Sequence, residues 1–163
     1  MPHHTSWPCT ERAFAALSES GAAAVRARDD ARLDEERSRV APHIAARMKE
    51  PVHSVFRMMR EWEVMVGAVE AAASGRDAEP RPLLDDYLFV LETRAGLEEA
   101  LHDLAAGPPA PLAGALASLD ARFLAHTVPD DPADPGTLAR WLAPLDRRPP
   151  PWLWNRRPRV APW

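Results

Sequence analysis

The residues that could carry chemistry are few and isolated from one another. Glu99 and His102 lie three residues apart, on one face of a predicted helix. Di-metal sites in helical bundles use this spacing, but they need two such pairs and further inward-facing carboxylates. The chain has one copy, and His102 adjoins Leu101 and Leu104 in a way that indicates a solvent-facing side chain. We therefore predict no metal site and no cofactor.

Two other histidines have competing interpretations. His53 is eight residues from Glu61, two helical turns away, so a surface histidine near a helix start is favoured over a catalytic pair. His126 continues an apolar stripe after Phe123. We interpret it as a partly buried, hydrogen-bonded histidine; the alternative is a polar group in a binding site.

The only cysteine, Cys9, excludes an internal disulfide and any site built from several cysteines. His3 and His4 are near it in sequence but belong to a terminus, where we expect no preorganised nucleophile and base. The chain has no glycine-rich phosphate loop, no serine elbow and no zinc-ligand spacing. These observations favour a non-enzymatic protein.

Asp85 and Asp86 form the one pair of adjacent carboxylates at a predicted helix start. Helix capping explains them better than metal binding or acid–base work, which is the alternative. Four charged residues lie on two helices predicted to be neighbours: Asp86, Arg94, Asp120 and Arg122. We expect ion pairs among these four that fix the register of the helices.

The strongest apolar periodicity runs from Pro51 to Gly75, in steps of three and four residues. A helix so apolar on one face must be buried. Further helices are predicted before Arg39, from Leu84 and from Pro111, with a short one at 137–143 and nothing regular beyond Pro149. The predicted core comprises Phe56, Met59, Trp62, Val66, Tyr87, Leu91, Leu119 and Phe123.

No strand pattern competes with these helices. We therefore predict an all-α fold, a helical bundle of about four longer helices with a short C-terminal helix and an irregular tail rich in proline, tryptophan and arginine. The predicted organisation is a charged helical extension at 1–39, the bundle at 40–145 and the tail at 146–163. The mixed charges of residues 26–39 favour a solvated helix, with a partner-gripping arm as the alternative.

Several short motifs are shared with a group of proteins. They are Trp62, Val69-Glu70, Leu84-Asp85-Asp86-Tyr87 with Leu91, Arg94 and Leu97, Leu119-Asp120 with Phe123 and Thr127, and Trp152 to Pro158. In these the chain resembles small uncharacterised all-helical proteins of GC-rich bacteria, from about Trp62 to Pro158. The resemblance implies that bundle and tail belong together, and it implies no activity.

Charge and hydropathy limit the partners and the compartment that we expect for the protein. The net charge of −4 argues against general nucleic-acid binding, and Lys49 is the one lysine among 20 basic residues, as a GC-rich genome would give. No signal peptide and no membrane span are predicted, so we expect a cytoplasmic protein.

The tail is the most unusual segment. Its five arginines and one aspartate give +4, which leaves −8 for the rest of a chain whose net charge is −4. Interleaved Trp and Arg can stack on nucleic-acid bases and meet phosphates, grip an acidic partner or sit at a lipid surface. We favour the alternative, in which the tryptophans fold back between the helices and the arginines meet the acidic bundle. The candidate partner-binding residues are Trp152, Trp154, Arg156, Arg157 and Trp163.

These patterns favour a helical protein–protein interaction or accessory protein, of the immunity type for example, whose partner and oligomeric state the sequence leaves open. The first alternative is a nucleic-acid-binding module that uses the basic tail. The second alternative is a small metal-dependent enzyme.

Overall fold

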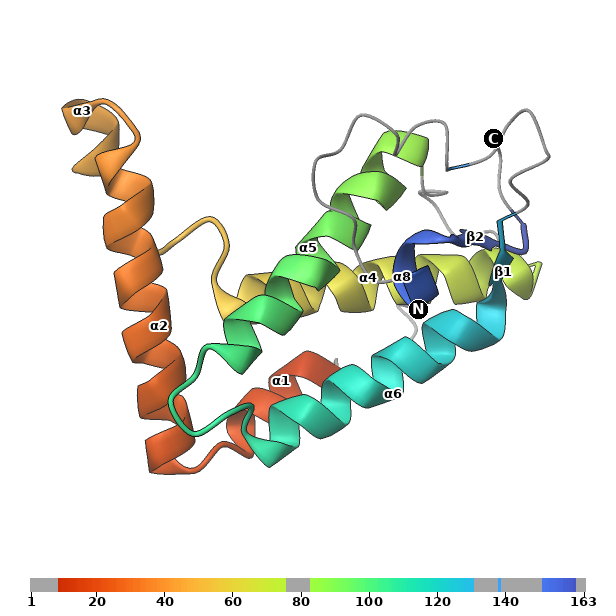
Figure 1. Cartoon of the computed structure of the whole chain (residues 1–163), viewed down its shortest axis with the longest axis horizontal. Coiled ribbons are helices and arrows are strands. Elements are labelled where there is room, and N and C mark those ends of the chain that lie inside the picture. The colour runs from red at the N-terminus through yellow and green to blue at the C-terminus, as the bar shows by residue number, and fades with distance from the viewer. Residues whose placement is uncertain (1–8, 76–82, 131–137, 139–150, 161–163) are drawn as a thin grey trace, which may run out of the picture. The chain divides into compact units, whose positions relative to one another are not determined.

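The computed structural model describes residues 9–75, 83–130, 138 and 151–160 (Figure 1). The protein is all-α, which confirms the predicted fold class. Four helices of 17 to 20 residues make up most of the described chain. They are α2 (Glu19–Ser38), α4 (Val55–Ala73), α5 (Leu84–His102) and α6 (Ala110–His126).

Five shorter elements complete the described fold. They are α1 (Cys9–Ala15), α3 (Pro42–Ala45), β1 (Thr127–Pro129), α8 (Pro151–Trp154) and β2 (Arg156–Pro158). The two strands pair antiparallel, with Thr127 opposite Pro158 and Pro129 opposite Arg156. The sequence does not predict them, because three residues are too few to show a two-residue alternation. The predicted helix at 137–143 lies outside the described residues, apart from Leu138, which is buried.

The chain forms two compact units, each made from two separate stretches of sequence. The first unit comprises Met1–Glu61 and Gly96–Leu116, and the second comprises Trp62–Ala95 and Ala117–Trp163. The boundaries fall inside α4, α5 and α6. They therefore differ from the boundaries predicted near residues 40 and 146.

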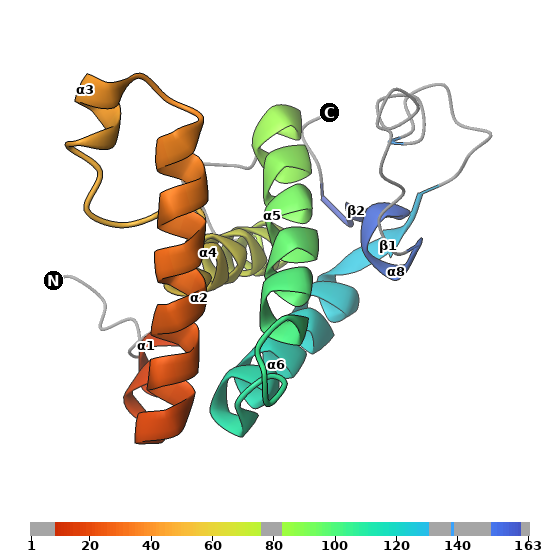
Figure 2. The same cartoon turned by 60° about the vertical axis from the view of Figure 1, so that its left-hand side comes forward.

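In the first unit, α2 is a single helix that begins at the N-cap Ser18, whose Oγ accepts a hydrogen bond from the Gly21 N–H. The helix is mostly polar and buries Val25 and Leu33, eight residues apart and therefore on one face. Ion pairs along the helix, such as Arg32 with Glu36, support it locally. Beyond the end of α2, the chain turns and α3 lies back beside its last turns (Figure 2).

Helix α4 begins at Val55, four residues after the predicted start at Pro51. Ser54 caps it, since its Oγ accepts a hydrogen bond from the Arg57 N–H at 3.2 Å. The helix ends before Gly75, whose φ of 64° suits the left-handed cap that glycine adopts without strain.

Seven of the eight residues expected in the core are fully buried. In the second unit, the ring of Phe123 lies 4.9 Å from that of Trp62 and 6.4 Å from that of Tyr87. Aromatic rings at such separations add to the stabilisation that comes from burial alone. The fully buried residues are Met59, Trp62, Val66, Tyr87, Leu91, Leu119 and Phe123.

Phe56 is the exception, with 39% of its surface exposed. It follows Val55, and Val55 and Met59 lie on the buried stripe of α4, so Phe56 is turned about 100° away from it. The centre of its ring instead lies 5.0 Å from that of Phe14, with the two rings nearly perpendicular. The placement of Phe56 in the core is therefore corrected.

Candidate functional site

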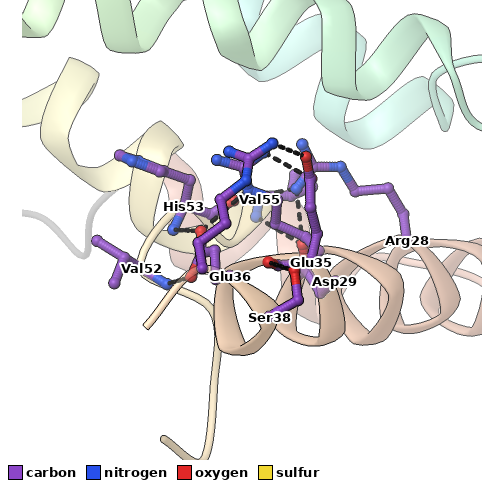
Figure 3. Close-up of polar contacts among 10 residues, drawn as sticks. Arg28, Asp29, Glu35, Glu36, Ser38, Val52, His53 and Val55 are labelled. Atoms are coloured by element: carbon purple, nitrogen blue, oxygen red, sulfur yellow. Dashed lines mark hydrogen bonds and ion pairs between the residues drawn. The ribbon is translucent and has the colours of Figure 1, made fainter. Parts of the chain in front are cut away.

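A polar cluster in the first unit fixes the backbone just before α4 (Figure 3). Asp29 and Glu36 lie seven residues apart on α2 and so share a face. Glu36 accepts hydrogen bonds from the backbone N–H of Val52 at 2.6 Å and of His53 at 3.3 Å. Asp29 accepts one from the backbone N–H of Val55 at 3.1 Å. Two side chains of one helix thus hold three backbone donors of a segment far away in sequence.

Arginines of the same helix complete this cluster. Arg28 donates from Nη1 to the His53 carbonyl oxygen at 3.0 Å, and Arg37 donates from Nη2 to the Met48 carbonyl oxygen at 2.7 Å. Arg32 donates from Nε to Glu36 at 3.0 Å. Side chains of α2 therefore hold residues 48–55 at both ends of the segment, with a donor at Met48 and with a donor and acceptors at residues 52–55.

The two carboxylates respond differently to their surroundings. Burial raises the pKa of Asp29, and the hydrogen bonds from Val55 and Arg28 offset only part of that effect. Burial also acts to raise the pKa of Glu36, but the hydrogen bonds from Val52, Arg32 and His53 outweigh it and lower that pKa. Glu36 is therefore the better stabilised anion of the two.

The segment that connects the end of α2 to this held stretch, residues 40–52, is named the arm tip; its last part, from Met48, is held by α2 side chains. Its larger aliphatic side chains face solvent: Val40, Ile44 and Val52 are 38%, 46% and 48% exposed. Arg47, Lys49 and Glu50 are exposed in the same segment. Single exposed aliphatic residues are common on protein surfaces. All three fall within 13 residues of the chain, and the backbone of Val52 is held by Glu36.

The second unit contains a buried ion pair among the residues for which pairing was predicted. Arg94 donates from Nε and Nη2 to the two carboxylate oxygens of Asp120, at 2.9 and 2.6 Å. Arg122 pairs instead with Glu70, at 2.7 and 2.5 Å. Asp86 is exposed in the first turn of α5 and takes part in neither pair. The expectation that includes Asp86 is corrected.

The other carboxylate at this helix start also differs from its predicted role. Helix α5 begins at Leu84, so Asp85 lies in its first turn and is not the N-cap residue. There the positive end of the helix dipole still favours its charge.

The tail is attached to the second unit through residues proposed to bind a partner. The Arg94 guanidinium lies 5.2 Å from the centre of the Trp152 ring, and Trp154 is buried. The buried hydroxyl of Tyr87 donates to the Arg156 carbonyl oxygen at 2.7 Å, and burial raises the pKa of Tyr87.

Arg156 caps the C-terminal end of α6. It donates to the carbonyl oxygens of Leu124 and Thr127 and to the Thr127 hydroxyl, at 3.3, 2.9 and 2.8 Å. A cation at this end also meets the negative pole of the helix dipole. Arg157 is partly exposed, with its Nε 3.8 Å from an Asp130 carboxylate oxygen. Trp163 lies outside the described residues.

The histidines and the cysteine are dispersed. His126 is partly exposed, with Nε2 3.8 Å from an oxygen of Glu70, and His102 is exposed. Cys9 opens α1, whereas His3 and His4 lie outside the described residues. Within the ranges that the structure describes, no three His, Cys, Asp or Glu side chains are grouped closely enough to hold a metal ion.

Among the described helices, none combines the length and apolar character needed to cross a membrane. Comparison with protein-family models, with curated proteins and with solved structures finds no match for this chain.

Sequence reasoning missed Asp29 and Glu36. They lie in the charged stretch 26–39, which the mixed-sign pattern assigns to a solvated helix. Their partners are backbone N–H groups, which every non-proline residue has, so no side-chain pattern identifies them.

Proposed function

We propose that this protein is a non-enzymatic interaction protein that binds another protein through the arm tip. The observation that carries the proposal is the exposure of Val40, Ile44 and Val52 in a short segment whose C-terminal part Glu36 and Arg37 hold at Val52 and Met48. Because the contacts at Met48 and Val52 exist before a partner arrives, less conformational entropy is lost in residues 48–52 on binding.

The exposed groups indicate the chemistry of the partner. Burying the exposed part of each aliphatic side chain would contribute about 1 kcal/mol, so three of them supply an apolar centre. Arg47 and Lys49 outnumber the exposed Glu50 in this segment, and their excess positive charge would favour carboxylates at the rim of the partner surface. We further propose that this binding takes place in the cytoplasm, because the chain has one cysteine and no internal disulfide is possible.

The proposal is tested by site-specific photo-crosslinking in the native host. A photoreactive residue at position 44 should give a discrete crosslinked product with one partner protein. The matched control is position 64, because Val64 is an exposed aliphatic residue of α4 outside the arm tip. Adding Val40→Ser and Val52→Ser to the position-44 probe should remove the product. Equal crosslinking from positions 44 and 64 would overturn the proposal.

A further inference from the structure

The first half of α5 has an exposed face that mixes apolar and acidic residues. Leu83, just before the helix, is 64% exposed, and Phe89 is 51% exposed. Asp85 and Glu92 lie four residues before and three residues after Phe89, and Asp86 lies three before it. Spacings of three and four place Asp85, Asp86, Phe89 and Glu92 on one side of the helix. Leu83 precedes the helix by one residue. These five residues are named the Phe89 surface.

The opposite side of the same stretch is buried. Tyr87, Val90, Leu91 and Arg94 pack into the second unit, so the helix is anchored without using Phe89. Asp85, Asp86 and Glu92 are exposed, and none of the ion pairs among the described residues includes them. The Phe89 surface thus presents an aromatic ring beside three carboxylates.

The helix dipole explains part of this pattern. Carboxylates at positions 85 and 86 stabilise the start of α5 whatever else they do. The dipole acts within the first turn, so it does not account for Glu92, and it does not account for the exposure of Leu83 and Phe89.

We propose that the Phe89 surface binds an arginine-containing segment of a partner protein. A guanidinium group can stack on the exposed Phe89 ring while its N–H groups donate to the adjacent carboxylates. An aliphatic side chain of the same segment can cover Leu83. The three negative charges repel nucleic acids and anionic membranes, and they attract a basic segment. This surface differs in charge from the arm tip, where the exposed charged groups include Arg47 and Lys49.

The test uses two labelled peptides and the full chain. One peptide is a short amphipathic helix of arginine, leucine and alanine, and its analogue has glutamate at each arginine position. Fluorescence anisotropy should show the arginine peptide binding at least tenfold more tightly than the analogue, with affinity that falls as salt rises. Phe89→Ala should weaken binding by about tenfold, consistent with a cation–π contact.

Matched variants separate the aromatic contribution from the charge. Asp85→Asn with Asp86→Asn and Glu92→Gln should weaken binding and flatten its salt dependence. Two controls change an exposed aliphatic residue, Val64→Ala, and an exposed carboxylate, Asp103→Asn. Each should bind the arginine peptide within twofold of the wild-type affinity. If Phe89→Ala alters the helical circular dichroism, Phe89→Leu replaces it in the test. This variant keeps an apolar side chain but has no ring, and it should still bind the arginine peptide more weakly than the wild type.

Three outcomes would overturn the inference. The first is equal affinity for the two peptides, and the second is equal affinity of Phe89→Ala and Val64→Ala. The third is that the chain binds no peptide but forms a concentration-dependent dimer, seen by sedimentation, which Phe89→Ala abolishes. That result would assign the surface to a second copy of the chain. The arm-tip variant with Val40, Ile44 and Val52 changed to serine should bind the arginine peptide like the wild type. Failure of this inference therefore leaves the proposed function standing.

Discussion

Arg94 of α5 and Asp120 of α6 form a two-point ion pair in the second unit, with Nε to Oδ1 at 2.9 Å and Nη2 to Oδ2 at 2.6 Å. Asp120 Oδ1 also accepts a hydrogen bond from the Trp62 indole N–H at 3.0 Å. The Arg94 side chain is 4% exposed. One carboxylate therefore joins three helices of this unit, and the same arginine lies over Trp152 of the tail.

Replacing Arg94 with methionine should lower the free energy of unfolding by about 3 to 5 kcal/mol, because it leaves the Asp120 charge without its partner. Urea denaturation measures the change. Arg57→Met is the control, since Arg57 pairs with Glu61 at the surface and should cost less than about 1 kcal/mol. In a double-mutant cycle, Arg94→Met with Asp120→Asn should cost less than the sum of the two single changes. Additive costs would contradict a coupled pair.

Glu36→Gln and Asp29→Asn should change the pH dependence of stability in opposite directions. The lowered pKa of Glu36 contributes stability at pH values above its ordinary pKa of 4.5, and that contribution is lost as pH falls through the folded-state pKa. The raised pKa of Asp29 contributes stability at pH values below its ordinary pKa of 3.8, and that contribution is lost as pH rises through the folded-state pKa.

Denaturation at a series of acidic pH values measures both effects. Relative to the wild type, Glu36→Gln should lose less stability on acidification, and Asp29→Asn should lose more. The same sign of change in both variants would contradict the contacts described for this cluster.

Two glycines of the first unit should respond oppositely to alanine. Gly107 has φ of 72°, and an added Cβ meets nothing within 4 Å, so Gly107→Ala should cost about 1 to 2 kcal/mol through backbone strain alone. Gly114 lies inside α6 with equal space, and Gly114→Ala should stabilise by about 0.5 to 1 kcal/mol. Thermal unfolding distinguishes the two. A stabilising change at Gly107 would contradict the left-handed turn.

Arg156→Met should loosen the tail and the end of α6 together. The variant loses three hydrogen bonds and leaves the carbonyl oxygens of Leu124 and Thr127 without that donor. Amide exchange at 127–130 and 152–158 should speed up by roughly tenfold or more, since each lost bond costs about 1 kcal/mol. Arg157→Met is the control and should change exchange less than threefold, because its ion pair is 3.8 Å long and partly exposed. Unchanged exchange in Arg156→Met would contradict the capping role.

Patterns that repeat along the chain were predictable. The buried side of α4 follows from apolar residues in steps of three and four, and it places Met59, Trp62 and Val66 correctly. Phe56 shows the limit of this reasoning, because hydrophobicity alone does not tell which side of the stripe a neighbouring residue takes. The pairing of Arg94 with Asp120 rather than of Arg122 with Asp120 depends on helix rotation, which composition does not specify.

Contacts between side chains and distant backbone were not predictable. Glu36 reaches the N–H groups of residues 52 and 53, and Arg156 reaches carbonyl oxygens at 124 and 127. In each case one partner is a backbone group that any residue could supply. The arm tip could not be recognised for a different reason. Val52 continues the apolar spacing of α4, yet it lies before the helix and is exposed.

The central claim is that the arm tip is the surface that binds the partner. Isothermal titration calorimetry with the protein identified by crosslinking at position 44 tests it most directly. Ile44→Ser should weaken binding by about tenfold or more, as expected for an anchor in the centre of an interface, while the exposed Val64→Ser should leave the affinity within twofold. Equal affinities for wild type and Ile44→Ser, with both chains folded, would contradict the claim.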